Sequence, residues 1–172
     1  MIITIFEDKN RNSLFPLNQI RASFELRCGA FTNLERIQNS IQIEDEIQLF
    51  VRDEIKEVIQ KRYPNFKVNP NVLSKGIWLN GAALWSDRHI NEIASPKTYT
   101  NKNKIIAFHS DESIPSEIGY DFIQQSASVS IEFHIPFIHN SWDAIFLQSK
   151  IISLDAIHFI DFHHGEIHPS AV

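Results

Sequence analysis

The 172-residue sequence contains little cysteine and little glycine, no excess of positive charge and no long apolar run. Its one cysteine, Cys28, excludes an internal disulfide and fits a reducing compartment, so we expect a cytoplasmic protein. The formal net charge of -5 argues against a nucleic-acid partner. The lack of an apolar run of roughly 20 residues argues against a membrane span. No Gly-x-Ser-x-Gly motif occurs, so the chain has no nucleophile elbow of the hydrolase type.

Apolar patterns along the chain predict alternating strands and helices. Strands are expected at residues 2–6, 47–51, 76–81 and 104–109. Helices are expected around 31–41, where Thr32 and Glu35 form a capping box, after Asp53 as far as Pro64, and from about 140 to 160. Residues 95–103 are polar and are expected to form a surface loop. This alternation of strands and helices predicts the α/β fold class, with a Rossmann-like, mainly parallel sheet flanked by helices.

The last predicted helix, capped by Asn140 or Ser141, has one apolar stripe that we expect to pack against the domain. The stripe consists of Trp142, Ile145, Phe146, Ser149, Ile152, Ala156, Phe159 and Ile160. After it, the segment Gly165-Glu-Ile-His-Pro-Ser-Ala-Val172 is similar to the first turn of a β-helix, which cannot bury its inner face alone. We therefore expect an α/β domain at 1–164, the start of a truncated β-helix at 165–172, and a longer natural protein.

In place of a glycine-rich loop, the first predicted strand is followed by basic and amide side chains. The first glycine of the chain is Gly29, so no glycine lets backbone N–H groups approach a phosphate there. The donors in this region are Lys9, Arg11, Asn12, Arg21 and Arg27. Guanidinium groups match phosphate oxygens in pairs, which favours an anion site at this strand end. The alternative is a solvated loop whose cations pair with Glu7, Asp8 and Glu25.

Three other kinds of residue are weighed against simpler roles. Four histidines, at positions 158, 163, 164 and 168, suggest a zinc site, but no partner pair of ligands is evident and a polar hinge is the simpler interpretation. Cys28 is interpreted as a small buried filler. Trp78 and Trp142 are expected in the core. Trp85 is a candidate for a pocket rim, with burial as the alternative.

A series of residues near the N-terminus carries a resemblance to a known family. In order along the chain, they are Phe6-Glu7, Arg11-Asn12, Leu14, Pro16-Leu17, Arg21, Glu25-Leu26-Arg27 and Gly29, with weaker matches at 78–81 and 142–143. The pattern resembles the N-terminal domain of the glycine-poor branch of sugar nucleotidyltransferases, similar to bifunctional enzymes that make UDP-N-acetylglucosamine. Such proteins commonly carry a left-handed β-helix after this domain, which agrees with residues 165–172.

The resemblance implies attack of a sugar-1-phosphate on the α-phosphate of a nucleoside triphosphate, with release of pyrophosphate. It implies catalytic roles for Arg11 and Arg27. It also implies substrate binding by Asn12, Arg21, Asn80 and Gly81, a Mg²⁺ cofactor, and a homo-oligomer formed through the β-helix. The sugar and the base stay open.

The chain also departs from the better-known branch of the family. The glycines of the first loop are absent, and alignment on Leu14 and Pro16 leaves no counterpart of the usual lysine, for which Arg27 could substitute. Ala82 stands where a carboxylate for magnesium is expected, and the metal ligand stays open between Asp87, Asp111 and Asp143. Two hypotheses follow: an active nucleotidyltransferase, or a degenerate, non-catalytic binding or assembly domain attached to a β-helix acyltransferase.

Overall fold

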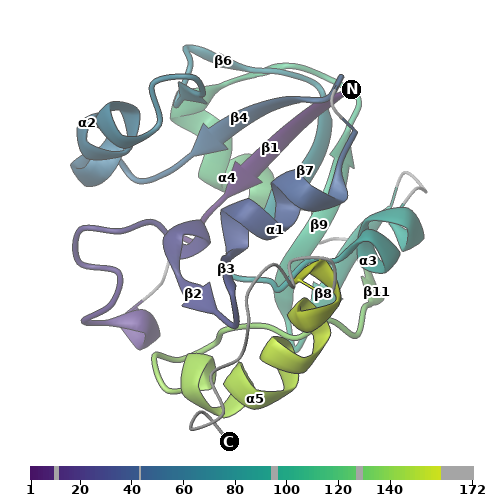
Figure 1. The fold of residues 1–172 in the computed structure, drawn as a ribbon. Helices are drawn as coiled ribbons and strands as arrows, with labels where there is room; N and C mark the ends of the chain where they lie inside the picture. Colours follow the sequence, from purple (N-terminus) through teal and green to yellow (C-terminus); the bar gives the residue numbers. More distant parts are fainter. Residues whose placement is uncertain (10–11, 43, 94–96, 127–129, 160–172) are drawn as a thin grey trace, which may run out of the picture.

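A seven-stranded, mostly parallel sheet forms the centre of the computed structural model, which describes residues 1–9, 12–42, 44–93, 97–126 and 130–159 (Figure 1). Only β9 runs antiparallel to its neighbours in this sheet of the described residues. The spatial order is β11 (Ser130–Glu132), β8 (Thr98–Asn101), β9 (Lys104–Ser110), β7 (Gly76–Asn80), β1 (Ile2–Phe6), β4 (Glu46–Phe50) and β5 (Lys67–Val68). The predicted fold class, α/β with a mainly parallel sheet, is confirmed.

Helices cover both faces of the sheet. In Figure 1, α1 lies in front of the sheet and α4 behind it. The α-helices are α1 (Asn33–Ser40), α2 (Asp53–Arg62), α3 (Asp87–Glu92), α4 (Gly119–Gln125) and α5 (Asp143–Asp155). Two small antiparallel pairs lie outside the sheet: β2 (Arg27–Cys28) with β3 (Phe31–Thr32), and β6 (Val72–Leu73) with β10 (Ile114–Pro115). Short 3-10 turns are η1 (Asn12–Leu14), η2 (Ser23–Glu25), η3 (Ser116–Ile118) and η5 (Ala156–Phe159).

Each central strand is apolar on both sides, because both faces of the sheet are buried. On β1, Ile3 and Ile5 belong to the large core cluster that includes Leu34 and Ile37 of α1. Phe6 points to a second cluster on the other face, which contains Trp78 and Phe108 and is covered by α4. The nearly continuous apolar runs of the sequence therefore mark buried strands of a parallel sheet.

Most of the elements predicted from the sequence are present. The capping box is confirmed, because the Glu35 backbone N–H donates to Thr32 Oγ1 and the Thr32 N–H donates to Glu35 Oε2. Asp53 is the first residue of α2, while the capping position belongs to Arg52. The prediction of a surface loop at 95–103 was wrong for Thr98–Asn101, which form the buried strand β8, whereas Lys102 and Asn103 form an exposed turn. Asn101, for example, donates to the carbonyls of Phe133 and Ile135, so its polar side chain is tolerated inside.

The prediction that the apolar stripe of the last helix is buried was wrong. Trp142 is 54% exposed and Phe146 is 78% exposed, so Trp142 is not a core residue. The opposite side of α5 packs on the domain through Ile151, which joins a third apolar cluster with Cys28 and Leu26. Ile160 lies outside the described residues.

The other single residues follow the simpler interpretations. Trp78 is fully buried, and Trp85 is 1% exposed and donates from its Nε1 to the Asn80 carbonyl. Cys28 is buried, and burial raises the pKa of its thiol, as expected for a filler. The segment 165–172 and three of the four clustered histidines lie outside the described residues. Among the described residues, no helix is both long and apolar enough to cross a membrane.

Candidate active site

The carboxyl ends of β1 and β7 meet at the point where the sheet changes its direction of winding. The chain leaves β1 toward β4 on one side of the sheet and leaves β7 toward β8 on the other. In open α/β sheets, ligands bind in the crevice at such a switch point. Because β9 is antiparallel to β7, its first residue, Lys104, lies at this same edge. The edge therefore brings together Asp8 after β1, Asn80 at the end of β7, and Lys104.

Asp8, Asn80 and Lys104 form a connected polar cluster. Asn80 Nδ2 lies 3.3 Å from Asp8 Oδ1 and donates also to the Ile105 carbonyl at 2.8 Å, while Asn80 Oδ1 accepts from the Ala82 N–H. Lys104 Nζ lies 3.8 Å from Asp8 Oδ2. Asn80 is fully buried, whereas the side chains of Asp8 and Lys104 are 22% and 40% exposed. Asn80 thus orients Asp8, and Asp8 and Lys104 are the members that solvent reaches.

Two hollows open on either side of Asp8 and Lys104. The larger, about 190 Å³, is lined by Glu7, Asp8, Lys9, Asn103, Lys104, Ile105, Tyr120, Ile123 and Gln124. The smaller is lined by Asp8, Ser13, Leu14, Ser23, Ala82, Lys104, Phe137, Ile138 and His139. Lys9, which the sequence placed among the donors, lines the larger hollow and lies 3.8 Å from Asp121 of α4. Two lysines, Lys9 and Lys104, therefore line the same hollow as Asp8.

His139 adds a titratable group to this edge. Burial lowers the pKa of its imidazole, and Lys102 and Lys104 act in the same direction, while Asp143 and Asp8 oppose them. Its backbone is held in place, because the His139 N–H donates to Asp143 Oδ2 and the His139 carbonyl accepts from Ser13 Oγ. With a lowered pKa, His139 is neutral near pH 7 and can accept or donate a hydrogen bond there.

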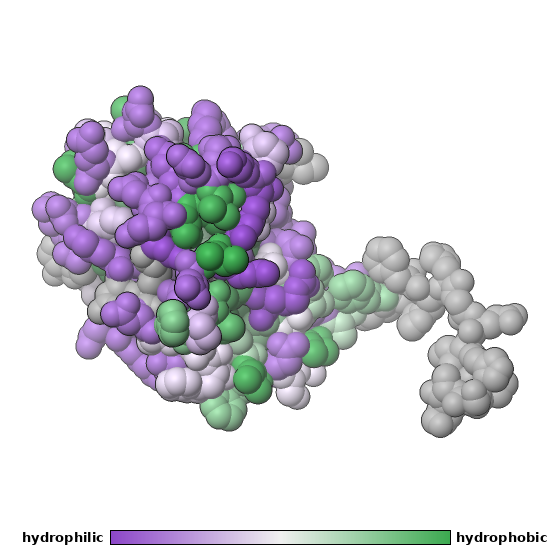
Figure 2. Space-filling view, turned by 90° about the vertical axis from the view of Figure 1, so that its left-hand side faces the viewer, coloured by the Kyte–Doolittle hydropathy of each residue, from purple (hydrophilic) through white to green (hydrophobic). Residues whose placement is uncertain are grey.

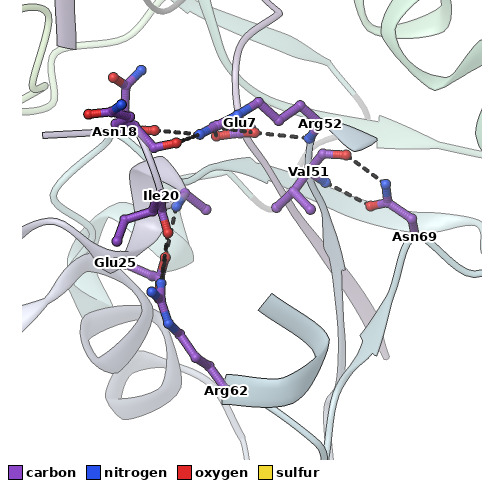
Figure 3. A network of polar contacts seen from close by, with 10 residues as sticks. Glu7, Asn18, Ile20, Glu25, Val51, Arg52, Arg62 and Asn69 are labelled. Carbon is purple, nitrogen blue, oxygen red and sulfur yellow. Dashed lines mark hydrogen bonds and ion pairs between the residues drawn. The ribbon is translucent and has the colours of Figure 1, made fainter. Parts of the chain in front are cut away.

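The loop that follows β1 is held over the strand ends by two arginine–glutamate pairs (Figure 3). Glu7, which is fully buried, accepts from both the backbone N–H and the guanidinium of Arg52. The same guanidinium donates to the carbonyls of Asn18 and Gln19. Because Arg52 lies two residues after the end of β4, this pair joins the loop to a rigid strand end.

The second pair anchors the far end of the loop. Arg62, at the end of α2, donates to both carboxylate oxygens of Glu25, at 2.9 and 3.1 Å, and to the Ile20 carbonyl. Glu25 Oε2 also accepts from the Ala22 N–H. Beside it, Asn69 exchanges two hydrogen bonds with the backbone of Val51 (Figure 3). Glu7 and Glu25 are thus paired by arginines from the β4 and α2 segments.

The residues assigned by resemblance fall into two groups. Asn80 and Gly81 lie at the switch point, where the Gly81 N–H donates to the Phe6 carbonyl and an added Cβ would lie 2.8 Å from Phe24 Cβ. Asn12 begins η1 on the loop, and Arg21 is exposed. Arg27 is 56% exposed and pairs with Glu35 at 3.4 Å. Neither Arg21 nor Arg27 lines the two hollows, and Arg11 lies outside the described residues.

Lys104 and His139 were not singled out from the sequence. Lys104 opened a predicted strand, but only the antiparallel direction of that strand brings it to the edge of Asp8. His139 comes from a segment without regular periodicity, so the sequence holds no signal for its position.

A carboxylate suited to magnesium is present, although not where the alignment placed it. Magnesium is commonly held by one or two carboxylates together with substrate phosphate oxygens. Asp8 fits this mode, since it is partly exposed and faces the hollows. Asp143 is occupied by the backbone N–H groups of His139 and Asn140. Among the described residues, no group of three or more metal-ligating side chains comes together.

Comparison with known proteins identifies a family. The model of the sugar nucleotidyl transferase family matches residues 3–160, so the chain belongs to that family. No curated protein matches the chain.

Two solved structures are similar to it in outline. One is the 4-diphosphocytidyl-2C-methyl-D-erythritol synthase of Anaerococcus prevotii, with 10% identity, a TM-score of 0.44, and coverage of 88% of this chain and 98% of that one. The other is a putative glucose-1-phosphate thymidylyltransferase of Bacillus anthracis in complex with a sucrose, with 9% identity, a TM-score of 0.47, and coverage of 96% and 98%.

Proposed function

We propose that this chain transfers a nucleotidyl group from a nucleoside triphosphate to a sugar-1-phosphate. A phosphate oxygen of the sugar-1-phosphate would attack the α-phosphorus, a new P–O bond would form, and the bond to the β-phosphate would break to release pyrophosphate. Such a reaction needs little covalent work from a protein and depends on positioning and on neutralising charge. The observation that carries the proposal is the Asp8–Lys104 pair at the switch point between β1 and β7.

The roles within this site follow from its geometry. Lys104 and Lys9 would bind phosphate oxygens and oppose the developing negative charge, since both border the larger hollow. Asp8, held by Asn80, would bind Mg²⁺ together with the substrate phosphates, and the ion would supply further positive charge. His139, neutral and half-buried, would hydrogen-bond to the substrate from the smaller hollow.

The roles of the arginines and of Asn12 stay predictions. Arg11, Asn12 and Arg21 belong to the segment between β1 and η2, so they would act from a loop that Arg52 and Arg62 hold in place. Arg27 would have to leave Glu35 in order to reach a phosphate at the strand ends. Asn80 would orient Asp8 through its hydrogen bond to that carboxylate. Gly81 would allow Phe24 to pack closely against the backbone of the site.

The non-catalytic alternative has specific observations in its favour. Ala82 occupies the position of the family carboxylate, and Arg27 is paired outside the hollows. The competing function would be binding or assembly, with acyl transfer by an attached β-helix.

Pyrophosphate release separates the two functions. We would measure it with each nucleoside triphosphate, Mg²⁺ and a set of hexose-1-phosphates, beginning with UTP and N-acetylglucosamine-1-phosphate because of the family resemblance. We expect Asp8→Asn and Lys104→Met each to lower kcat/KM by about 100-fold or more, the usual scale for removing a group that stabilises transition-state charge. The matched control is Lys75→Met, because Lys75 is exposed beside the amino end of β7.

Circular dichroism would confirm that the variants keep their fold. Equal activity of Lys104→Met and Lys75→Met would reject the assignment of the site. No release above background by the folded, wild-type chain would favour the binding or assembly function. An Arg27→Ala variant with unchanged kcat/KM would leave Arg27 as the partner of Glu35 only.

A further inference from the structure

The exposed side of α5 and η5 carries a stripe of large apolar side chains. Its large members are Trp142, Ile145, Phe146, Ile152 and Phe159, which are between 46% and 78% exposed. Solvent-exposed helices ordinarily show charged or polar residues on their outer side. On α5 both sides are apolar, because Ile151, Ala144 and Leu147 contact the domain on the inner side. Large apolar residues on the second side of a helix are expected to be covered as well.

The size of the stripe is that of a protein interface. A Trp or Phe side chain carries about 150–250 Å² of surface, so five large, half-exposed apolar side chains leave on the order of 500 Å² open to solvent. A standard interface buries roughly 800 Å² on each partner, whereas exposed apolar patches on monomers rarely exceed a few hundred. The face shown in Figure 2, by contrast, is mostly hydrophilic, with apolar side chains gathered near its centre.

The spacing of the stripe identifies the occupant. Trp142, Ser149 and Ala156 are seven residues apart, and Ile145, Ile152 and Phe159 are seven apart as well, three residues after each of the first set. This is the alternating three-and-four spacing of the two core positions of a coiled coil. Large residues occupy one position throughout, whereas the other contains the small residues Ser149 and Ala156.

An antiparallel pair of identical helices brings these two positions together. With the two-fold axis between Ser149 and Ile152, Ile145 faces the partner's Ala156 and Ser149 faces the partner's Ile152. The outermost layer pairs Trp142 with the partner's Phe159, which lies on η5 and stacks on Phe31 within its own chain. Each branched side chain thus meets a small one, and the pairing is reciprocal, as a two-fold interface requires. We propose that the exposed stripe of α5 and η5 binds a second copy of this chain in this antiparallel register.

The first test is the molar mass of the chain by sedimentation over a range of concentrations. We expect a reversible dimer of the 19.9-kDa chain. Ile145→Glu should weaken the dimer by about 100-fold or more, because the symmetry places the change in two layers, and each loses the burial of an isoleucine. The matched control is Ile118→Glu, since Ile118 of η3 is 48% exposed and lies away from α5.

The second test concerns the register. Ile145→Lys and Ala156→Glu should each be monomeric alone, and a mixture of the two should form a heterodimer, because the introduced ammonium group of one chain then faces the introduced carboxylate of the other in one layer. A dimer that Ile145→Glu leaves intact would overturn the proposal. So would a wild-type chain that stays monomeric at every concentration, which would assign the stripe to another protein or segment. Monomeric single variants without rescue in the mixture would overturn the antiparallel register.

Discussion

The candidate site at the strand ends and helix α5 differ in where their side chains find contacts. At the strand ends, charged groups meet partners within the chain: Glu7 with Arg52, Glu25 with Arg62, and Asp8 with Lys104. On α5, large apolar groups such as Ile145 and Phe146 face solvent. A single chain can form a binding site for a charged ligand by itself, because water solvates the polar side chains of the site until the ligand binds. An exposed apolar ridge gains nothing until a second surface removes it from water.

The largest expected effect comes from breaking the ion pair beneath the site. Arg52→Met should lower the free energy of unfolding by about 3–5 kcal/mol, because it removes the guanidinium that pairs with the fully buried Glu7 carboxylate and donates to the loop carbonyls. Urea denaturation followed by circular dichroism measures the change. The control is Arg88→Met, whose exposed pair with Glu92 should contribute almost nothing. Equal losses in the two variants would contradict the difference drawn between buried and exposed pairs.

A smaller effect separates the two sides of α5. Ile151→Ala should cost about 2–4 kcal/mol, since Ile151 is 2% exposed and fills the cluster under the helix. Ile152→Ala, one residue along, should cost little at concentrations where the chain is monomeric, because that side chain is 49% exposed. Chemical denaturation at low protein concentration measures both. Similar losses of unfolding free energy in the two variants would mean that α5 does not turn Ile151 toward the domain and Ile152 toward solvent.

The smallest expected effect is a dependence on pH. Because burial lowers the pKa of folded His139 below its ordinary value of 6.5, the unfolded chain takes up a proton at a higher pH than the folded chain. The contribution of the neutral His139 ring to the free energy of unfolding is therefore fully present above pH 6.5 and is lost as the pH falls below that value. His139→Gln should flatten the fall in unfolding free energy between pH 7 and 5.

A second histidine provides the comparison for this measurement. Burial also lowers the pKa of His89, so His89→Gln should flatten the curve in the same direction. Denaturation at several pH values measures the slopes, and a His139→Gln slope equal to that of the wild type would contradict the burial of its ring.

The central elements were predictable because their patterns are local. The apolar runs at 2–6 and 47–51, and the capping box of Thr32 and Glu35, each carry their signal within a few residues. Strand β8 was missed because its threonine and asparagine side chains are satisfied by segments about 30 residues later, such as the carbonyls of Ser126 and Phe133. The burial of a polar strand depends on partners that local composition does not reveal.

The location of the candidate site could be predicted from the sequence, but only some of the residues that form it could. The rule for strand ends pointed to the segment after β1, the family resemblance pointed to Asn80 and Gly81, and both lie at the switch point. The partners of the glutamates were not foreseen, because Arg52 and Arg62 are distant in sequence from Glu7 and Glu25. Lys104 reaches the site only because β9 runs against its neighbours.

The sequence by itself determined the α/β class, the parallel core strands, the start of α1 and the family pattern around Pro16 and Leu17. These features depend on periodicity, helix capping and short motifs, whose signals come from residues close together in the sequence. Only the tertiary structure decided which side of α5 faces the domain, since both sides are apolar and periodicity alone does not choose between them. It also decided which charges meet at the strand ends, because those pairs form between segments that the fold, not the chain order, makes neighbours.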